Sequence, residues 1–272
     1  MSSIMRPILL DSAPSHGMSR ARLVRAYLID TKYEFIRIWR NPTFLIPVLL
    51  IPPIVYVLFG VAFVNSLDYS AIVAFTRPEL LRLMFINLSV FSILGPTMVS
   101  LGTFLALERD SGLLTFKRAL PMPAQAPLLA KTLFAMLSIV ALMVVMTAEA
   151  IVFAKLDFTL TQYAGIWLVC ILGSLPFALL GLYIGASVSG STANGLVTGV
   201  YMSMAMLGGL LFQLPPAFAW IALFSPAFYL SQLGFSAAGM NTLFDPFVAA
   251  ALLLAFTVLF GWLAFRKIRR TE

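Results

Sequence analysis

Six apolar runs, each close to the length of a membrane-crossing helix, dominate this sequence of 272 residues. A helix needs about 20 consecutive apolar residues to cross the hydrocarbon layer of a bilayer. Only helices and closed barrels satisfy their backbone polar groups in lipid, and runs this long without alternation exclude barrel strands. The composition agrees, because 61% of the residues are hydrophobic and 11% are charged. The sequence therefore predicts an all-α integral membrane protein.

The charge distribution predicts how the chain is oriented. Six crossings place both ends on one side; if that side is the cytoplasm, it holds fifteen lysines and arginines and the other side holds three. This is a strong positive-inside bias. The net charge of +7 thus comes from residues that flank apolar runs, which argues against a nucleic-acid partner. The predicted spans are 43–64, 83–107, 130–153, 163–188, 194–213 and 246–265.

The remaining segments complete the predicted organisation. We expect a polar tail at 1–18, an amphipathic interfacial helix at 19–42, one six-span domain at 43–265 and a basic cytoplasmic tail at 266–272. The interfacial helix has apolar positions at alternating spacings of four and three, with basic residues on its other faces. It could be a membrane anchor alone or could contact a partner. The apolar positions are Val24, Leu28, Thr31, Phe35 and Ile38, and the basic ones are Arg22, Arg25, Lys32 and Arg40.

Two segments between spans also carry structural signals. The segment 108–127 leaves a long apolar helix through an acid-base-acid cluster, becomes amphipathic and stops at prolines. It favours a short helix parallel to the membrane, and an ordinary positive-inside loop is the alternative. The segment 214–239 is too apolar for an aqueous loop, but prolines divide it into pieces too short to span. We expect a re-entrant hairpin on the outer side, packed on protein or lining a cavity.

Several kinds of chemistry are excluded by the sequence. There is no G-x-x-x-x-G-K-[ST] phosphate loop, so the chain cannot bind ATP by that route. Cys170 and His16 are the only residues of their types, which excludes an intrachain disulfide, a cysteine metal cluster and Ser/His catalysis. The spans contain no HExxH pair, no GxSxG elbow and no catalytic pair of carboxylates. The sequence therefore predicts neither an enzyme nor a metal site.

One carboxylate and two glycine motifs lie within the spans. Glu149 is the single acidic residue inside a predicted span, so it is a candidate for proton coupling, unless it reaches the outer surface or bonds a neighbouring helix. The motifs 181–185 and 195–199 have the spacing Gly-x-x-x-Gly, which permits close approach of helices. We interpret both as packing motifs, with dimerisation as the alternative.

In the order of these features, the chain resembles the ABC-2-type permeases, the transmembrane subunits of a class of ATP-binding-cassette exporters. The resemblance runs from about residue 30 to the C-terminus. It is carried by YEFIRIWRNPTFL at 33–45, LERDSGLLTFKRALPMP at 107–123 and the broken hairpin at 214–239. It implies that two permease chains, identical or related, pair in the bacterial cytoplasmic (inner) membrane. It also implies that two copies of an ATPase subunit, which holds ATP and Mg²⁺, bind their cytoplasmic face; no cofactor is expected on this chain.

The resemblance further implies that residues 108–121 form a coupling helix that inserts into a cleft on the ATPase. In this interpretation an acid-base-acid cluster orients the helix, a glycine permits the turn, apolar residues dock, and two basic residues meet acidic groups on the ATPase. These residues are, in that order, Glu108, Arg109 and Asp110; Gly112; Leu113, Phe116 and Leu120; and Lys117 and Arg118, with Pro121 at the end of the helix.

The family's substrate path is expected at the dimer interface, along the second and fifth spans. Methionine and aromatic side chains adapt to varied apolar shapes, which suits an amphipathic drug-like compound or a lipid; ordinary helix packing would use the same residues. They are Phe85, Asn87, Phe91, Ser92, Tyr201, Met202, Met204, Met206 and Phe212. The predicted function is an exporter permease for such a molecule. A polysaccharide or lipo-oligosaccharide exporter, a proton-coupled transporter using Glu149 and a non-transporting scaffold are the alternatives.

Overall fold

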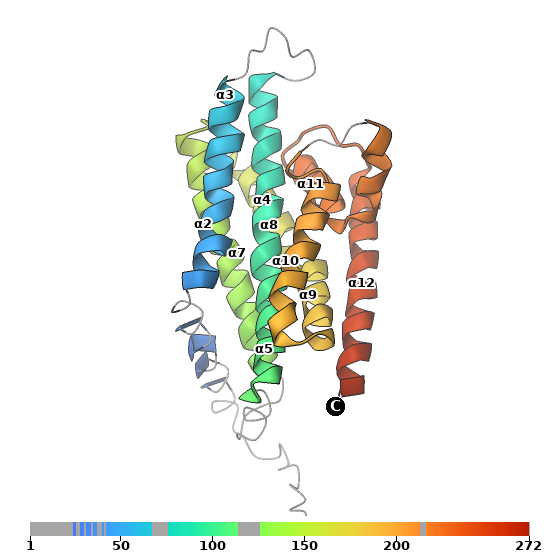
Figure 1. Ribbon diagram of the computed structural model, residues 1–272. Helices are drawn as coiled ribbons and strands as arrows, with labels where there is room; N and C mark the ends of the chain where they lie inside the picture. Colours follow the sequence, from blue (N-terminus) through green and yellow to red (C-terminus); the bar gives the residue numbers. More distant parts are fainter. Residues whose placement is uncertain are drawn as a thin grey trace, which may run out of the picture.

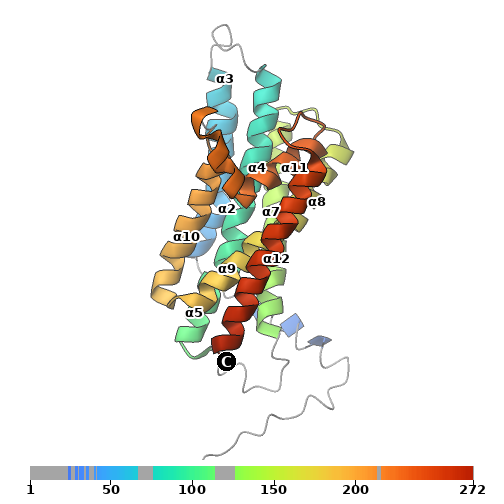
Figure 2. The ribbon, with the colours of Figure 1, turned by 90° about the vertical axis from the view of Figure 1, so that its right-hand side faces the viewer.

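The computed structural model describes residues 24–25, 28–29, 31–33, 35–36, 40, 42–66, 76–113, 126–212 and 216–271. All regular structure within these ranges is helical, and the helices form an elongated bundle (Figures 1 and 2). In chain order the elements are α2 (Pro42–Val55), the π-helix η1 (Tyr56–Phe63), α3 (Val64–Ser66), α4 (Arg77–Leu101), α5 (Thr103–Asp110), α7 (Ala126–Val152), α8 (Leu160–Gly173), α9 (Leu175–Ser187), α10 (Gly190–Leu207), the 3₁₀ helix η2 (Pro216–Phe224), α11 (Pro226–Ala237) and α12 (Pro246–Thr271).

Five helical stretches of the described chain are long and apolar enough to cross a membrane. They are Leu49–Ser66, Arg77–Asp110, Leu128–Val152, Leu160–Ser187 and Pro246–Ile268. These match five of the six predicted spans and identify a multi-pass membrane protein. The predicted span 194–213 instead forms α10, which is not among them, because its first turns contain Gly, Ser, Thr and Asn. The predicted hairpin region forms two short helices, η2 and α11.

The second span is the centre of the bundle. Every residue from 85 to 101 in α4 is buried, and this helix packs against α2, α7, α9, α10 and α11. Two of its hydroxyl groups bond to the helix's own carbonyls: Ser92 Oγ donates to Ser89 O at 2.7 Å and Thr97 Oγ1 donates to Ile93 O at 2.6 Å, whereas the buried Oγ atoms of Ser89 and Ser100 have no partner among the described residues. Such bonds satisfy buried hydroxyls without a second helix. Among the described residues, the hydroxyls of Ser92 and Thr97 therefore form no hydrogen bond from α4 to a neighbouring helix.

Two glycines bring α9 against the backbone of α4. A Cβ added at Gly185 would lie 2.3 Å from the Gly102 carbonyl oxygen, and one added at Gly181 would lie 2.6 Å from the Met98 oxygen. The packing role predicted for the motif 181–185 is confirmed. At Gly195 and Gly199, by contrast, no described atom lies within 4 Å of an added Cβ. Among the described residues, the second motif does not pack within the chain.

The two ends of the bundle carry different elements. The start of α2, the end of α5, the turn between α9 and α10 and the C-terminal end of α12 gather at the lower end in Figure 1. The helix α3, the start of α4, η2 and α11 lie at the upper end. The last helix runs to Thr271, so the predicted basic tail continues α12. The two ends are hereafter called the α5 end and the hairpin end.

The predicted interfacial helix at 19–42 is only partly within the described residues. Val24, Leu28, Phe35 and their described neighbours from 24 to 36 are helical and mostly exposed. The ring of Phe35 packs on Phe134 of α7, with 6.0 Å between ring centroids. The tail 1–18, together with Arg22 and Ile38, lies outside the described residues.

Candidate functional site

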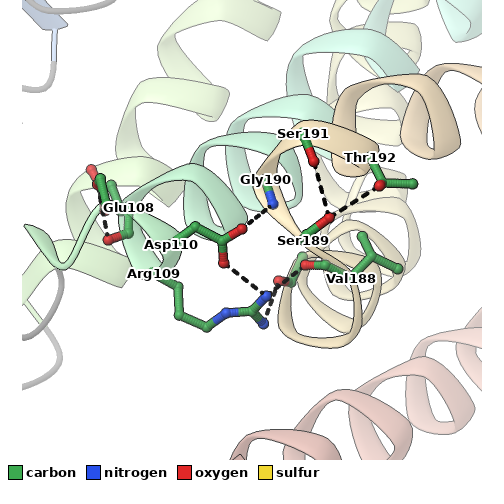
Figure 3. A network of polar contacts seen from close by, with 10 residues as sticks. Glu108, Arg109, Asp110, Val188, Ser189, Gly190, Ser191 and Thr192 are labelled. Carbon is green, nitrogen blue, oxygen red and sulfur yellow. Dashed lines mark hydrogen bonds and ion pairs between the residues drawn. The ribbon is translucent and has the colours of Figure 1, made fainter.

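The end of the second span joins four elements through three consecutive side chains. The helix α5 continues the direction of α4 past Gly102 and ends at Asp110, with Ser111 as its C-cap residue. Gly112 then has φ +71°, a left-handed conformation that glycine adopts without steric cost. The chain thus leaves the span at a defined turn, directly after the cluster Glu108, Arg109 and Asp110 (Figure 3).

Arg109 binds the end of α9. Its guanidinium donates from Nη1 to Gly185 O at 3.2 Å and from Nη2 to Val188 O at 2.6 Å. The last carbonyls of a helix have no partner within the helix, and a cation there interacts favourably with the helix dipole. Arg109 therefore holds α9 at its C-terminal end by charge and by direct hydrogen bonds (Figure 3).

Asp110 binds the start of α10. The first residue of that helix, Gly190, follows Val188 by only two positions in the sequence. Asp110 Oδ2 accepts a hydrogen bond from the Gly190 backbone N–H at 2.6 Å, and its Oδ1 lies 3.2 Å from Arg109 Nη2. A carboxylate at a helix N-terminus satisfies a free N–H and complements the positive end of the dipole. The hydroxyl of Ser189 contacts those of Ser191 and Thr192, which closes the same turn. Opposite charges thus hold the end of one helix and the start of the next.

Glu108 points to the other side and pairs with Lys131 of α7. The Lys131 Nζ atom lies 2.8 Å from Glu108 Oε1, and the two side chains are 0% and 2% exposed. Burying two charges costs free energy because both lose their hydration, and only good pairing geometry compensates for that cost. Removing one partner destabilises the protein further, because it leaves an unpaired buried charge. The pair joins the helices on either side of the segment 111–125. We name Glu108, Arg109, Asp110, Lys131 and the turn 185–190 the α5 junction.

Only part of the α5 junction could be predicted from the sequence. Lys131, at the start of the predicted span 130–153, is not among the residues predicted for the site. A usable signal did exist: Glu108 and Lys131 each continue an apolar run, at the two ends of the same connecting segment. The contacts of Arg109 and Asp110 cross more than seventy residues of sequence to the uncharged turn at 185–190, where no charge pattern marks a partner.

The other predicted coupling residues lie mostly outside the described residues. Leu113 is the last described residue before the gap at 114–125. Phe116, Lys117, Arg118, Leu120 and Pro121 lie within that gap, so their docking role stays a prediction.

The residues predicted for the substrate path are divided between two environments. In α4, Phe85, Asn87, Phe91 and Ser92 are all buried. The ring of Phe91 meets Tyr201 of α10, with 6.5 Å between centroids, so these two predicted residues do lie together. Asn87 Nδ2 lies 3.5 Å from Gly209 O, beyond the end of α10. Tyr201, Met202 and Met204 are half-buried, while Met206 and Phe212 are exposed.

Phe85 belongs to an aromatic cluster rather than to the face shared with α10. Its ring centroid lies 5.8 Å from that of Tyr56, 5.9 Å from that of Phe158 and 6.0 Å from that of Tyr163. Nearby, Arg82 stacks on Phe158 and donates to Asp157. This hydrogen bond holds the pKa of the Asp157 carboxyl below its usual value.

Glu149 lies at the hairpin end of α7 and is half-buried. Its Oε2 atom is buried and has no hydrogen-bond partner among the described residues. No second acidic or basic residue of the described chain forms an ion pair with it.

These features define a class: a multi-pass α-helical membrane protein with a charged junction at one end of its bundle. The ABC-2 type transporter family model matches residues 25–238, and the chain belongs to that family. Over 183 residues, 65% of this chain and 69% of the relative, it is 28% identical to "Putative transport permease YvfS" of Bacillus subtilis (strain 168). Family membership makes the chain a transport permease of an ABC transporter, and such a permease associates with an ABC ATPase subunit.

Proposed function

We propose that the chain is the permease of an exporter that moves an amphipathic small molecule or a lipid outward across the bacterial cytoplasmic membrane. The energy comes from a separate ATPase subunit that holds ATP and Mg²⁺, since this chain has no phosphate loop. Two ATPase copies act on a pair of identical permeases. The α5 end, with both ends of the chain, faces the cytoplasm, where the basic residues concentrate.

The α5 junction is the observation that carries this proposal. Residues 108–121 act as the coupling helix, and their first three residues bond to α7, α9 and α10. A displacement of this segment by the ATPase therefore moves several helices together, because short charge-assisted bonds join them. Packed elements that shift as rigid bodies are the usual carriers of such transitions.

The membrane arrangement follows from the same reasoning. The helix α10 is the additional span, packed on one side against α4, α5 and α9, so that six crossings return the chain to the cytoplasm. The helices η2 and α11 form a hairpin that re-enters the outer leaflet. Nine residues and twelve residues are too short to cross a bilayer.

The exposed side of α10 supports pairing of two permeases. Gly195 and Gly199 face no described atom, while Leu196 and Leu207 nearby are exposed. A face of small residues lets a second helix approach closely, and packing is the main attraction between helices in lipid. We assign this face to the second permease chain.

The test is transport by proteoliposomes that contain this chain and its ATPase. We expect movement of an amphipathic substrate that requires ATP and persists when the proton gradient is collapsed. A Glu149→Gln variant should transport at close to the wild-type rate. Transport that does not require ATP would contradict the proposal. If collapsing the proton gradient and the Glu149→Gln substitution each abolished transport, proton coupling through Glu149 would replace it.

A further inference from the structure

A cavity opens inside the hairpin end of the single chain. It has a volume of about 680 Å³ and lies between the first turns of α4, the end of α10, the helices η2 and α11, and the loop before α12. Pockets for small ligands fall mostly between about 300 and 1,000 Å³. We call it the outer cavity. Figures 1 and 2 place α11 and the end of α10 beside each other at this end, opposite α5.

The wall of the outer cavity is mainly apolar, with a few fixed polar groups. Leu83, Leu223, Phe228 and Phe244 line it, and the rings of Phe228 and Phe244 meet edge to face at 5.8 Å. Gln232 is 3% exposed and is held by a hydrogen bond from the Leu243 N–H to its Oε1 at 2.8 Å. An apolar chamber with a small number of positioned amides is the usual composition of a site for a largely apolar ligand.

A second, charged cavity adjoins the first. It has a volume of about 410 Å³, contains Glu79 and Arg82, and shares Leu83, Phe235 and Asn241 with the outer cavity. Glu79 and Arg82 are three residues apart on α4 and therefore lie on one face of the helix. Each is held in place: Glu79 accepts from the Thr76 N–H at 2.9 Å, and Arg82 is bonded to Asp157. The charged cavity is thus lined by the Glu79 carboxylate and by the Arg82 guanidinium, which is also ion-paired with Asp157 outside the lining.

We propose that the two cavities form one binding site, contained within a single chain, for a zwitterionic amphiphile. The apolar body occupies the outer cavity and the headgroup lies between Glu79 and Arg82. A headgroup of one sign would attract one of these residues and repel the other, whereas a zwitterion complements both. As a substrate site, it rests on the proposed function and specifies the headgroup of the transported molecule.

The site is tested on the purified chain without an ATPase, by native mass spectrometry from detergent with lysophosphatidylcholine as the probe. Asn241→Trp is the blocking variant, because Asn241 is exposed, lies in a loop and lines both cavities. Asn194→Trp is the matched control, an exposed asparagine near the start of α10. We expect one saturable adduct per chain, weakened about tenfold or more by Asn241→Trp and changed less than about twofold by Asn194→Trp.

Headgroup selection is the second arm. Lysophosphatidylglycerol and an alkyltrimethylammonium of equal chain length should each bind more weakly than lysophosphatidylcholine, and Glu79→Gln should weaken lysophosphatidylcholine while sparing lysophosphatidylglycerol. Glu79 is a surface residue, so this variant keeps the test valid if Asn241→Trp does not fold. Equal binding by wild type and both tryptophan variants, or equal binding of all three probes, overturns the proposal. Binding without ATP-driven movement of the probe would keep the site and refute the proposed transport of such molecules.

Discussion

Removing the buried lysine of the α5 junction is the most informative perturbation of its stability. In a Lys131→Met variant, Glu108 would keep its buried position but lose the ammonium 2.8 Å away. Both side chains are almost completely inaccessible, 0% and 2% exposed, so water cannot replace the missing partner. Removing one member of a buried pair costs about 3–5 kcal/mol, whereas replacing both members by neutral groups is often close to neutral.

The assay is a double-mutant cycle of unfolding free energies, measured by SDS titration in mixed micelles. Lys131→Met should lose about 3–5 kcal/mol. Adding Glu108→Gln should recover part of this loss, because coupling between residues in contact is about 0.5–3 kcal/mol. Lys155→Met is the matched control at an exposed position and should change stability by about 0.5 kcal/mol or less.

Additive effects of Glu108→Gln and Lys131→Met would refute this reasoning, since additivity means that the two side chains do not interact. A Lys131→Met variant as stable as the Lys155→Met control would refute it equally.

Three further outcomes are expected. Arg109→Lys keeps the charge but cannot reach the Gly185 and Val188 carbonyls together, so it should lower stability by about 1.5–3 kcal/mol and reduce transport per ATP hydrolysed, measured in proteoliposomes; unchanged values for both would contradict the assigned contacts. Gly185→Ala places a Cβ 2.3 Å from the Gly102 oxygen and should destabilise the chain by about 1–3 kcal/mol, whereas Gly261→Ala in α12, where the nearest described atom would lie 3.4 Å from the added Cβ, should be neutral or stabilising in the same titration. The Arg82–Asp157 pair should contribute stability above about pH 4, the usual aspartate pKa, and lose it as pH falls through the lowered pKa of folded Asp157; unfolding midpoints between pH 2 and 6 should show this acid dependence in wild type and less of it in Asp157→Asn.

Much of the bundle could be predicted because the hydropathy of a segment indicates directly whether it is long and apolar enough to span the membrane. The predicted span 130–153 corresponds to α7, Ala126–Val152, and the predicted span 246–265 lies within α12. The helix α10 is the exception: it begins four residues before the predicted span and ends six residues early, at the left-handed Gly209 turn. Its start depends on Asp110, eighty residues away, which binds the first N–H of the helix. A local pattern holds no information about such a distant cap.

The α5 junction illustrates the same limit for the site. The cluster at 108–110 could be singled out from sequence because an acid-base-acid cluster there leads into an amphipathic segment that stops at prolines, as in the permease family that the chain resembles. Which side chain faces which helix could not be predicted, because it depends on how α5, α7 and α9 are rotated in the bundle. The outer cavity was also beyond sequence reasoning, since segments from four parts of the chain enclose it.

The number of substrate molecules moved per ATP hydrolysed, compared between wild type and Phe116→Ala in proteoliposomes with the ATPase, tests the central claim most directly. That claim is that the segment 108–121 couples a separate ATPase to this permease. We predict that Phe116→Ala inserts normally and supports ATP hydrolysis while its transport per ATP falls about tenfold or more, as expected when a docking contact of a coupling element is lost. A Phe116→Ala transporter with the wild-type ratio would contradict the account.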